Sequence, residues 1–159
     1  MSKSRDHAGV VVPPPLFYLV PFLIGVLLHR IAPSDRIPDA IAPPARVLGA
    51  ALVLSGVSLG AGAILTFRRH RTTILPAHRP TTIIVSGGPY RFTRNPMYIG
   101  LALLYLGIPL FAGITWPYAL LPLAILAIDR LVIPREERYL EGKFGEEYRR
   151  YKTLVRRWL

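Results

Sequence analysis

The segment around Asn95 and Pro96 combines a predicted helix start with two positive charges. Asparagine is a favoured N-cap residue and proline a favoured first helical residue, so a helix is predicted to begin at Pro96. The free N–H groups at such a start, with Arg91 and Arg94 nearby in the chain, would attract an anion such as a carboxylate. In a plainer interpretation, Asn95 only caps the helix and the arginines contact lipid phosphates. The residues alone leave both interpretations open.

A pair of carboxylates, Glu136 and Glu137, follows Pro134. Acidic residues in the first turn of a helix offset its dipole, and this structural role is the simpler interpretation. In the functional interpretation, one carboxylate faces the arginine-containing segment and binds an ammonium or hydroxyl group of a ligand. Four tyrosines near these segments are more typical of a core or a membrane–water interface than of a ligand site. They are Tyr90, Tyr98, Tyr148 and Tyr151.

Several other kinds of site lack their sequence patterns. The chain has no cysteine, which excludes thiolate nucleophiles, disulfides and cysteine-ligated zinc. The four histidines show no HExxH or similar ligand spacing, so we expect no metal site. They are His7, His29, His70 and His78. The sequence also contains no nucleophile elbow and no GxGxxG dinucleotide fingerprint.

The elements that carry these residues are expected to be membrane-spanning helices. Only 18% of the 159 residues are charged, and the stretches 10–28, 47–67 and 96–128 contain no charge at all. About 20 helical residues cross a bilayer core of about 30 Å, so the first two stretches each fit one crossing. The third stretch is too long for one helix and is interrupted at residues 113–117. This interruption predicts a hairpin of two crossings.

We therefore predict an all-α integral membrane protein, with residues 1–159 forming a single membrane domain. About four transmembrane helices, the last two a hairpin, would be followed by an amphipathic C-terminal helix. The predicted spans are 10–31, 46–67, 96–112 and 116–133, with a cytoplasmic loop over 68–95 and the C-terminal helix over 134–159.

The predicted C-terminal helix rests on a hydrophobic stripe at steps of three and four residues. The stripe consists of Leu140, Phe144, Tyr148, Tyr151, Val155 and Trp158. A helix with one such face would lie against the cytoplasmic end of the bundle or at the membrane interface.

The second apolar stretch carries small residues on one helical face. Gly56 and Gly60 form a GxxxG motif, and Gly49 and Ala63 lie on the same face. Small residues let two helix backbones approach closely, so we expect this face to pack against another helix. Space for a cofactor beside the bare backbone is the less favoured interpretation.

The positions of the lysines and arginines predict the orientation. Most of the 20 lie near the N-terminus, in the loop 68–95 or in the C-terminal segment, which share one side if four helices cross. The positive-inside rule places that side, with both termini, in the cytoplasm. We attribute the net charge of +11 to contact with anionic membrane lipids and expect no nucleic-acid partner. The alanine- and arginine-rich composition favours a bacterial inner membrane.

Two segments, "GGPYRFTRNPMYIG" and "EERYLEGKFGEEYRRYKTLVRRW", closely resemble the isoprenylcysteine carboxyl methyltransferase family. In that family a G-x-Y-x-x-x-R-H-P-x-Y-x-G segment precedes a helical hairpin and then E-E-x-x-L-x-x-x-F-G-x-x-Y-x-x-Y. The resemblance covers residues 72–158, and both motifs occur in the family's order.

The resemblance implies a membrane methyltransferase that uses S-adenosylmethionine as its methyl donor, in a pocket on the cytoplasmic side. The acceptor would be a lipophilic small molecule or lipid, for example a prenylcysteine-like carboxylate. The donor contacts it implies are Leu75, Thr82, Ile83, Ile84, Val85, Tyr90, Asn95, Pro96, Met97, Tyr98 and Glu136.

Two departures from the family pattern concern the site. Asn95 stands where the family most often has histidine, and Val132 stands where its eukaryotic enzymes have a substrate-binding arginine. We expect Arg130 or Arg135 to orient the acceptor's negative group instead, as candidate catalytic residues. The alternatives are methylation of a phospholipid amine or a thiol, and a non-enzymatic membrane scaffold or lipid-binding protein.

Overall fold

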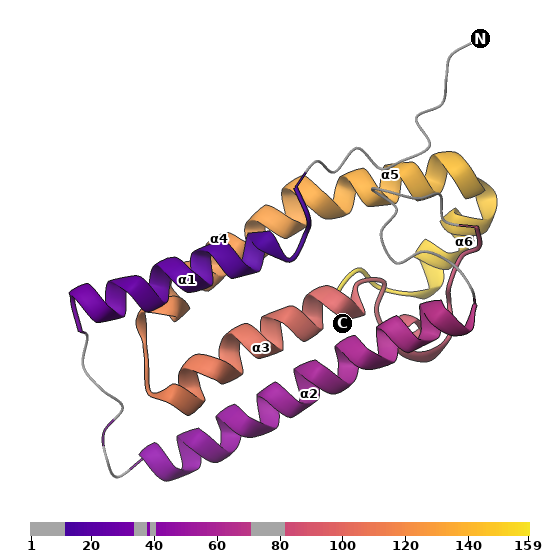
Figure 1. Cartoon of the computed structure of the whole chain (residues 1–159). Helices are drawn as coiled ribbons and strands as arrows, with labels where there is room; N and C mark the ends of the chain where they lie inside the picture. Colours follow the sequence, from indigo (N-terminus) through magenta and orange to yellow (C-terminus); the bar gives the residue numbers. More distant parts are fainter. Residues whose placement is uncertain (1–11, 34–37, 39–40, 71–81) are drawn as a thin grey trace.

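The computed structural model describes residues 12–33, 38, 41–70 and 82–159, and within these residues it contains helices and no strands. Leu75, one of the predicted donor contacts, lies outside the described residues. The elements are α1 (Leu16–Ile31), α2 (Ala42–Arg69), the 3-10 turn η1 (Gly88–Arg91), α3 (Pro96–Ala112), α4 (Trp116–Ala127), the π-helical turn η2 (Ile128–Val132), α5 (Ile133–Phe144) and α6 (Glu146–Leu154) (Figure 1).

Proline marks the start of most of these helices. Each of α2, α3 and α4 has a proline in its first two positions, where the missing N–H group removes no helical hydrogen bond. Helix α5 also has a proline there, Pro134, but it continues directly from η2 within the helical segment Trp116–Phe144. Helix α3 begins at Pro96, as the Asn95–Pro96 pair predicted, and ends at Ala112, where the C-cap residue Gly113 adopts a left-handed conformation with φ +71°. The local sequence therefore accounts for where these helices begin.

The helices pack as two pairs, α2 along α3 and α1 along α4 (Figure 1). The short turn at residues 113–115 joins α3 to α4, as the predicted hairpin requires, but each of the two helices packs mainly on a different partner. Close approach of the two helix backbones explains why α4 packs on α1. A Cβ on Gly25 of α1 would lie 2.6 Å from Pro117 Cα of α4, so these helices meet where α1 has no side chain.

The small-residue face of α2 packs on α3, which confirms the predicted helix contact. A Cβ on Gly56 would lie 2.7 Å from the Gly100 carbonyl oxygen, and one on Gly49 would lie 2.6 Å from the Phe111 nitrogen. The second glycine of the GxxxG motif differs, because a Cβ on Gly60 would meet nothing within 4 Å. The contact therefore depends on Gly49 and Gly56 more than on the motif as a pair.

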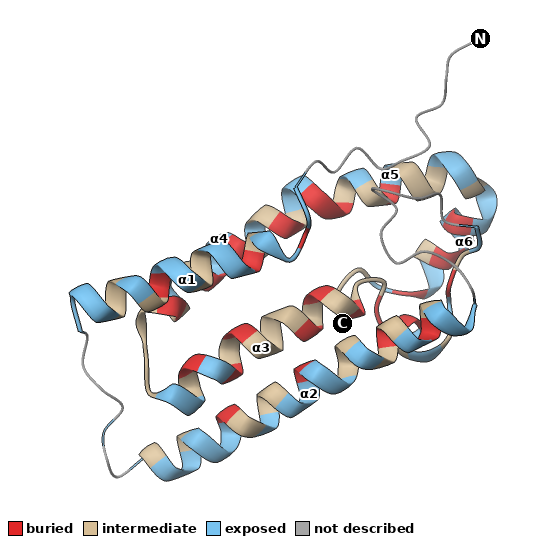
Figure 2. Cartoon of the chain, viewed as in Figure 1, coloured by how far each residue is buried: buried red, intermediate tan, exposed pale blue. Residues whose placement is uncertain are grey.

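Two helical segments, Ala42–Arg69 and Trp116–Phe144, are long and apolar enough to cross a membrane. Helices α1 and α3 are apolar but shorter. Large hydrophobic side chains are exposed along α1 and α2, including Leu27, Val47 and Leu54, and Figure 2 shows these exposed faces. An apolar surface of this extent is typical of lipid contact. Four crossings remain a prediction.

The C-terminal segment differs from the single helix predicted over 134–159. It contains two helices, α5 and α6, which are separated at Gly145, and residues 155–159 are not helical. Gly145 has φ +55° and ψ −125°, a conformation that residues with a Cβ rarely adopt. The hydrophobic stripe therefore continues across a bend, and Tyr148 and Tyr151 of α6 become buried.

Replacing Gly145 by alanine is expected to destabilise the protein by about 1–3 kcal/mol, because the bend would hold alanine in a strained conformation. Gly142 is the matched control, since it lies in α5 and a Cβ there would meet nothing within 4 Å. Gly142→Ala should be neutral or stabilising by up to about 1 kcal/mol. Thermal unfolding in detergent measures both changes, and equal melting temperatures would contradict the prediction.

Candidate functional site

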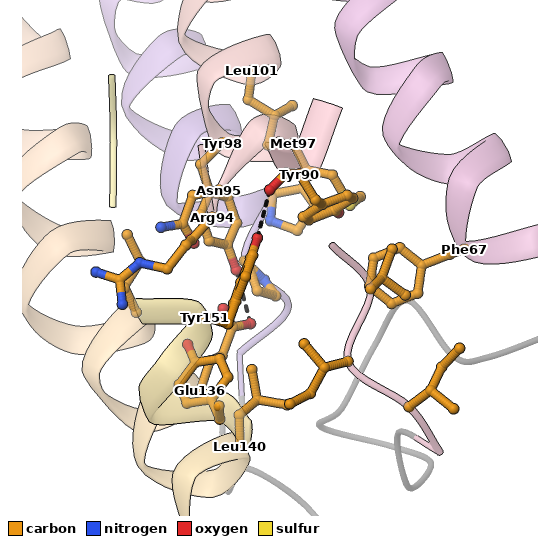
Figure 3. Close-up of a pocket in the computed structure, with 17 residues that line it drawn as sticks. Phe67, Tyr90, Arg94, Asn95, Met97, Tyr98, Leu101, Glu136, Leu140 and Tyr151 are labelled. Atoms are coloured by element: carbon orange, nitrogen blue, oxygen red, sulfur yellow. Dashed lines mark hydrogen bonds between the residues drawn. The ribbon is translucent and has the colours of Figure 1, made fainter. Parts of the chain in front are cut away.

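A cavity lies at the end of the bundle where the C-terminal end of α2 meets the start of α3, α5 and α6 (Figure 3). Its wall combines both motif segments with the residues that precede η1. The lining residues are Pro14, Pro15, Phe67, Ile83, Ile84, Val85, Tyr90, Arg94, Asn95, Met97, Tyr98, Leu101, Ile133, Glu136, Leu140, Tyr148 and Tyr151. Most of this surface is apolar or aromatic, so the few polar groups determine what the cavity can bind.

The most distinctive polar contact joins Tyr98 to Glu136. The Tyr98 hydroxyl donates a hydrogen bond of 2.8 Å to Glu136 Oε1, and both residues line the cavity. Tyr98 lies in the first turn of α3 and Glu136 in the first turn of α5, and each follows a proline by two residues. The functional interpretation of Glu136 thereby gains a geometric basis, because its carboxylate borders a pocket rather than solvent.

An aromatic wall covers the side of the cavity nearest α2. Tyr90 in η1 packs edge-on against Phe67 of α2, with ring centroids 5.2 Å apart. The Tyr151 hydroxyl donates a 2.8 Å hydrogen bond to the Tyr90 carbonyl oxygen, which ties α6 to η1. Burial raises the pKa of Tyr151 to about 12, so its hydroxyl remains protonated and able to donate at neutral pH.

Asn95 occupies the N-cap position of α3, but its side chain makes no capping hydrogen bond. Instead, Asn95 Nδ2 donates a 2.9 Å hydrogen bond to the carbonyl oxygen of Arg157. Asn95 therefore occupies the predicted N-cap position, but the prediction that its side chain caps the helix is wrong. Asn95 links the start of α3 to a segment near the end of the chain, while still lining the cavity.

The two arginines near Asn95 have different surroundings. Arg94 lines the cavity with a side chain only 12% exposed, and its Nη2 lies 3.3 Å from Glu137 Oε1. The charge of Arg94 is thus paired within the protein. Arg91 is exposed, with its guanidinium carbon 5.9 Å from the centre of the Phe92 ring. Of the two, Arg91 is the one available to lipid phosphates.

The structure brings together most of the predicted donor contacts. Eight of them line the cavity: Ile83, Ile84, Val85, Tyr90, Asn95, Met97, Tyr98 and Glu136. Thr82 and Pro96 do not line it, and Pro96 is instead fully buried in the packing of α3. Eight of the eleven predicted residues therefore border one space.

The candidate acceptor-orienting arginines lie elsewhere. Arg130 points away from the cavity, with a side chain 74% exposed and its Nε 3.5 Å from Asp129 Oδ2. Arg135 is also exposed and does not line the cavity. The π-helical turn of η2 and the start of α5 direct these side chains outward, whereas Ile133 and Glu136 face inward.

Sequence analysis did not assign several lining residues to the site. Phe67 and Leu101 were not singled out, and Leu140, Tyr148 and Tyr151 were expected to pack on the bundle or at the membrane interface, because apolar and aromatic residues at helical spacing normally form a buried face. The stripe that contains the last three did indicate which face of the C-terminal segment is buried. Among the residues that the structure describes, no three His, Cys, Asp or Glu side chains gather as a metal site.

Comparison with known proteins assigns the family. A sequence model described as phospholipid methyltransferase matches residues 44–147, about two thirds of the chain. The chain belongs to this family. The matched residues include α2, the cavity-lining loop, α3 and Glu136, so the assignment covers most of the cavity. The family resemblance predicted from the two motifs is thereby confirmed, and it supports a membrane methyltransferase.

An uncharacterised protein of Haemophilus influenzae is 49% identical to this chain over 63 residues, which are 40% of this chain and all of that protein. No solved structure matches the chain. The family assignment therefore rests on sequence, and the arrangement of the cavity comes from the present structure.

Proposed function

We propose that this protein transfers a methyl group from S-adenosylmethionine to a lipophilic acceptor at the cytoplasmic face of the membrane. The observation that carries the proposal is the Tyr98–Glu136 hydrogen bond inside a largely apolar, aromatic cavity. The two residues come from the two motifs that resemble methyltransferases. Their contact across the cavity supports a shared role at one ligand.

The chemistry of the lining residues fits this methyl donor. Glu136 offers a carboxylate to the ammonium or ribose hydroxyl groups, and apolar residues such as Ile84 and Met97 offer a surface for the adenine. A sulfonium cation is attracted by a nearby carboxylate and by aromatic faces such as those of Tyr90 and Phe67. The residues present therefore suit a cationic nucleoside better than an anionic one.

When bound, the donor supplies an electrophilic methyl group whose bond to sulfur breaks as the acceptor's nucleophilic atom bonds to the carbon. The protein's contribution is alignment and exclusion of water. Glu136 and Tyr98 would hold the polar end of the ligand, while Ile84, Val85 and Leu140 keep water from the reacting groups. A carboxylate or thiolate acceptor would then need no general base, whereas a phospholipid ammonium would first have to give up a proton to an acceptor such as water.

The apolar lining also supports a lipophilic acceptor. Pro14 and Pro15, at the start of α1, border the cavity together with Leu101 and Ile133. These residues belong to helices whose outer faces are apolar, so an acyl or prenyl chain could remain in an apolar environment while its head group enters the cavity. We place this end of the bundle, with both termini, at the cytoplasmic side of a bacterial inner membrane.

One observation favours an amine over a carboxylate as the acceptor group. Within the described part of the chain, the cationic side chain that lines the cavity is Arg94, and Glu137 already pairs with it. Arg130 and Arg135 lie outside the cavity. An acceptor carboxylate would therefore be repelled by Glu136 and would depend on Nε and Nη1 of Arg94, which Glu137 leaves without a partner, whereas the amine of a phospholipid would not be repelled. Methylation of a phospholipid amine is the second candidate function.

Equilibrium binding of S-adenosylmethionine to the detergent-purified protein tests the proposal. Saturable binding, followed by transfer of labelled methyl to phosphatidylethanolamine, would support the amine candidate. Transfer to a prenylcysteine instead would support carboxyl methylation. Absence of binding by folded protein would contradict the methyltransferase function and favour a scaffold or lipid-binding protein.

A further inference from the structure

We infer that residues 155–159, which we call the C-terminal clasp, hold the donor site in its binding geometry, and that Arg157 is the positioning residue. This inference rests on the proposed function, because it names what maintains the proposed donor site. The clasp lies beyond residues 44–147, the part of the chain that the family model matches.

The clasp first holds the start of α3 through backbone groups. The Arg94 N–H donates a 2.9 Å hydrogen bond to the Arg156 carbonyl oxygen. The Arg157 carbonyl oxygen accepts two more hydrogen bonds, of 3.0 Å from Thr93 Oγ1 and 2.9 Å from Asn95 Nδ2. Three consecutive residues before α3 are thus tied to the clasp, and the last two of them line the cavity.

The side chain of Arg157 contacts acidic residues of α5 and η2. Its Nη2 donates a 2.7 Å hydrogen bond to Glu137 Oε2, and its Nε lies 3.3 Å from Glu137 Oε1. Its Nη1 lies 3.3 Å from Asp129 Oδ1, which also accepts a 3.0 Å hydrogen bond from Trp158 Nε1. These contacts explain an acidic residue in η2, where the π-helical turn carries Asp129 beside the clasp.

Glu137 of α5 pairs both with Arg94, which precedes α3, and with Arg157 of the clasp. It is only 8% exposed, and a buried carboxylate requires paired charges and hydrogen bonds. Arg157 and Arg94 supply them together. Arg94 depends on this arrangement, since its Nε and Nη1 have no hydrogen-bond partner among the described residues.

The neighbours of these charges are the site residues. Glu137 follows Glu136 in α5, and Arg94 precedes Asn95 at the start of α3. Removing the Arg157 charge would leave Glu137 with Arg94 alone and would release α5 from the Arg157 side chain, while the hydrogen bonds to the Arg156 and Arg157 carbonyl oxygens remain. We therefore expect the distance between Tyr98 and Glu136 to become variable, which weakens donor binding without changing the cavity's composition.

The test compares donor binding by Arg157→Gln, Arg157→Lys and Arg156→Gln. Arg156 is the matched control, because its side chain is exposed and only its carbonyl oxygen holds α3. Arg157→Gln should raise the Kd for S-adenosylmethionine about tenfold or more, as loss of a charge-assisted hydrogen bond does. Arg157→Lys keeps the charge without the guanidinium geometry, so it should fall between Arg157→Gln and the wild type.

A purely structural role is distinguished by two further readouts. We expect the KM for the donor to rise while the KM for the acceptor stays unchanged, and we expect millimolar guanidinium to restore donor binding to Arg157→Ala. If Arg157→Gln does not fold, Arg157→Lys and the guanidinium rescue decide the question. The positioning role alone would be overturned if the Arg157 variants bound the donor with the Kd of the wild type. It would also be overturned if the KM values for donor and acceptor rose in parallel and guanidinium did not restore binding. Failure of the folded wild type to bind the donor would overturn the proposed function and this inference with it.

Discussion

Replacing Glu136 by glutamine is expected to weaken binding of S-adenosylmethionine by about 10- to 100-fold. A hydrogen bond to a charged group contributes about 1.5–3 kcal/mol, and about 1.4 kcal/mol corresponds to a factor of ten in affinity. Glutamine has nearly the same shape and can still contact Tyr98, so the change isolates the negative charge. Isothermal titration calorimetry on the detergent-purified protein would measure the loss.

Glu147 provides the control for this change. It lies on α6, is exposed and does not line the cavity, so Glu147→Gln should bind the donor as the wild type does. Tyr98→Phe should have a smaller effect than Glu136→Gln, because it removes one neutral donor and leaves the carboxylate in place. Equal affinities for the wild type and Glu136→Gln would show that the carboxylate does not contact the donor.

Replacing Gly56 by alanine is expected to destabilise the protein by about 1–3 kcal/mol, the usual effect of overpacking a close contact. The new Cβ would lie 2.7 Å from the Gly100 carbonyl oxygen, which belongs to the backbone of α3 and cannot rotate away. Helix α3 would have to move from α2. Because α3 carries Tyr98 and Met97 into the cavity, donor affinity should fall together with stability.

Gly60 is a control from the same motif and the same helix. Its added Cβ would meet nothing within 4 Å, so Gly60→Ala should be neutral or stabilising by up to about 1 kcal/mol through helix propensity. Thermal unfolding in detergent, measured side by side, distinguishes the two glycines. Equal destabilisation by both changes would mean that the GxxxG motif packs as a unit, against the geometry described here.

The sequence alone was informative where the determinants are local. The Asn95–Pro96 pair predicted the start of α3, because the conformational preference of proline acts at its own position. The residues carried over from the two motifs also proved to border one cavity in most cases, including Tyr98 and Glu136. Apolar stretches without charge predicted helices over α2 and α3, since composition and length can be read directly along the chain.

Features that depend on a distant partner could be seen only in the tertiary structure. Asn95 was predicted to cap its own helix, but its amide instead binds the Arg157 carbonyl oxygen, 62 residues away. Arg130 had the right type and approximate position for an acceptor contact, yet its direction depends on the π-helical turn of η2. Sequence spacing assigns a side chain to a helix face but does not specify the element that this face meets.

The sequence by itself determined the helical character of the described chain, the start of α3 and the two segments that supply most of the cavity. Only the tertiary structure decided that a Cβ on Gly56, but not one on Gly60, would collide with α3, that the C-terminal segment bends at Gly145, and that Glu137 pairs with Arg94 and Arg157. The physical reason is the range of the interactions. Helix starts and apolar periodicity arise from neighbouring residues, whereas backbone approach and buried ion pairs exist only once separate helices have packed together.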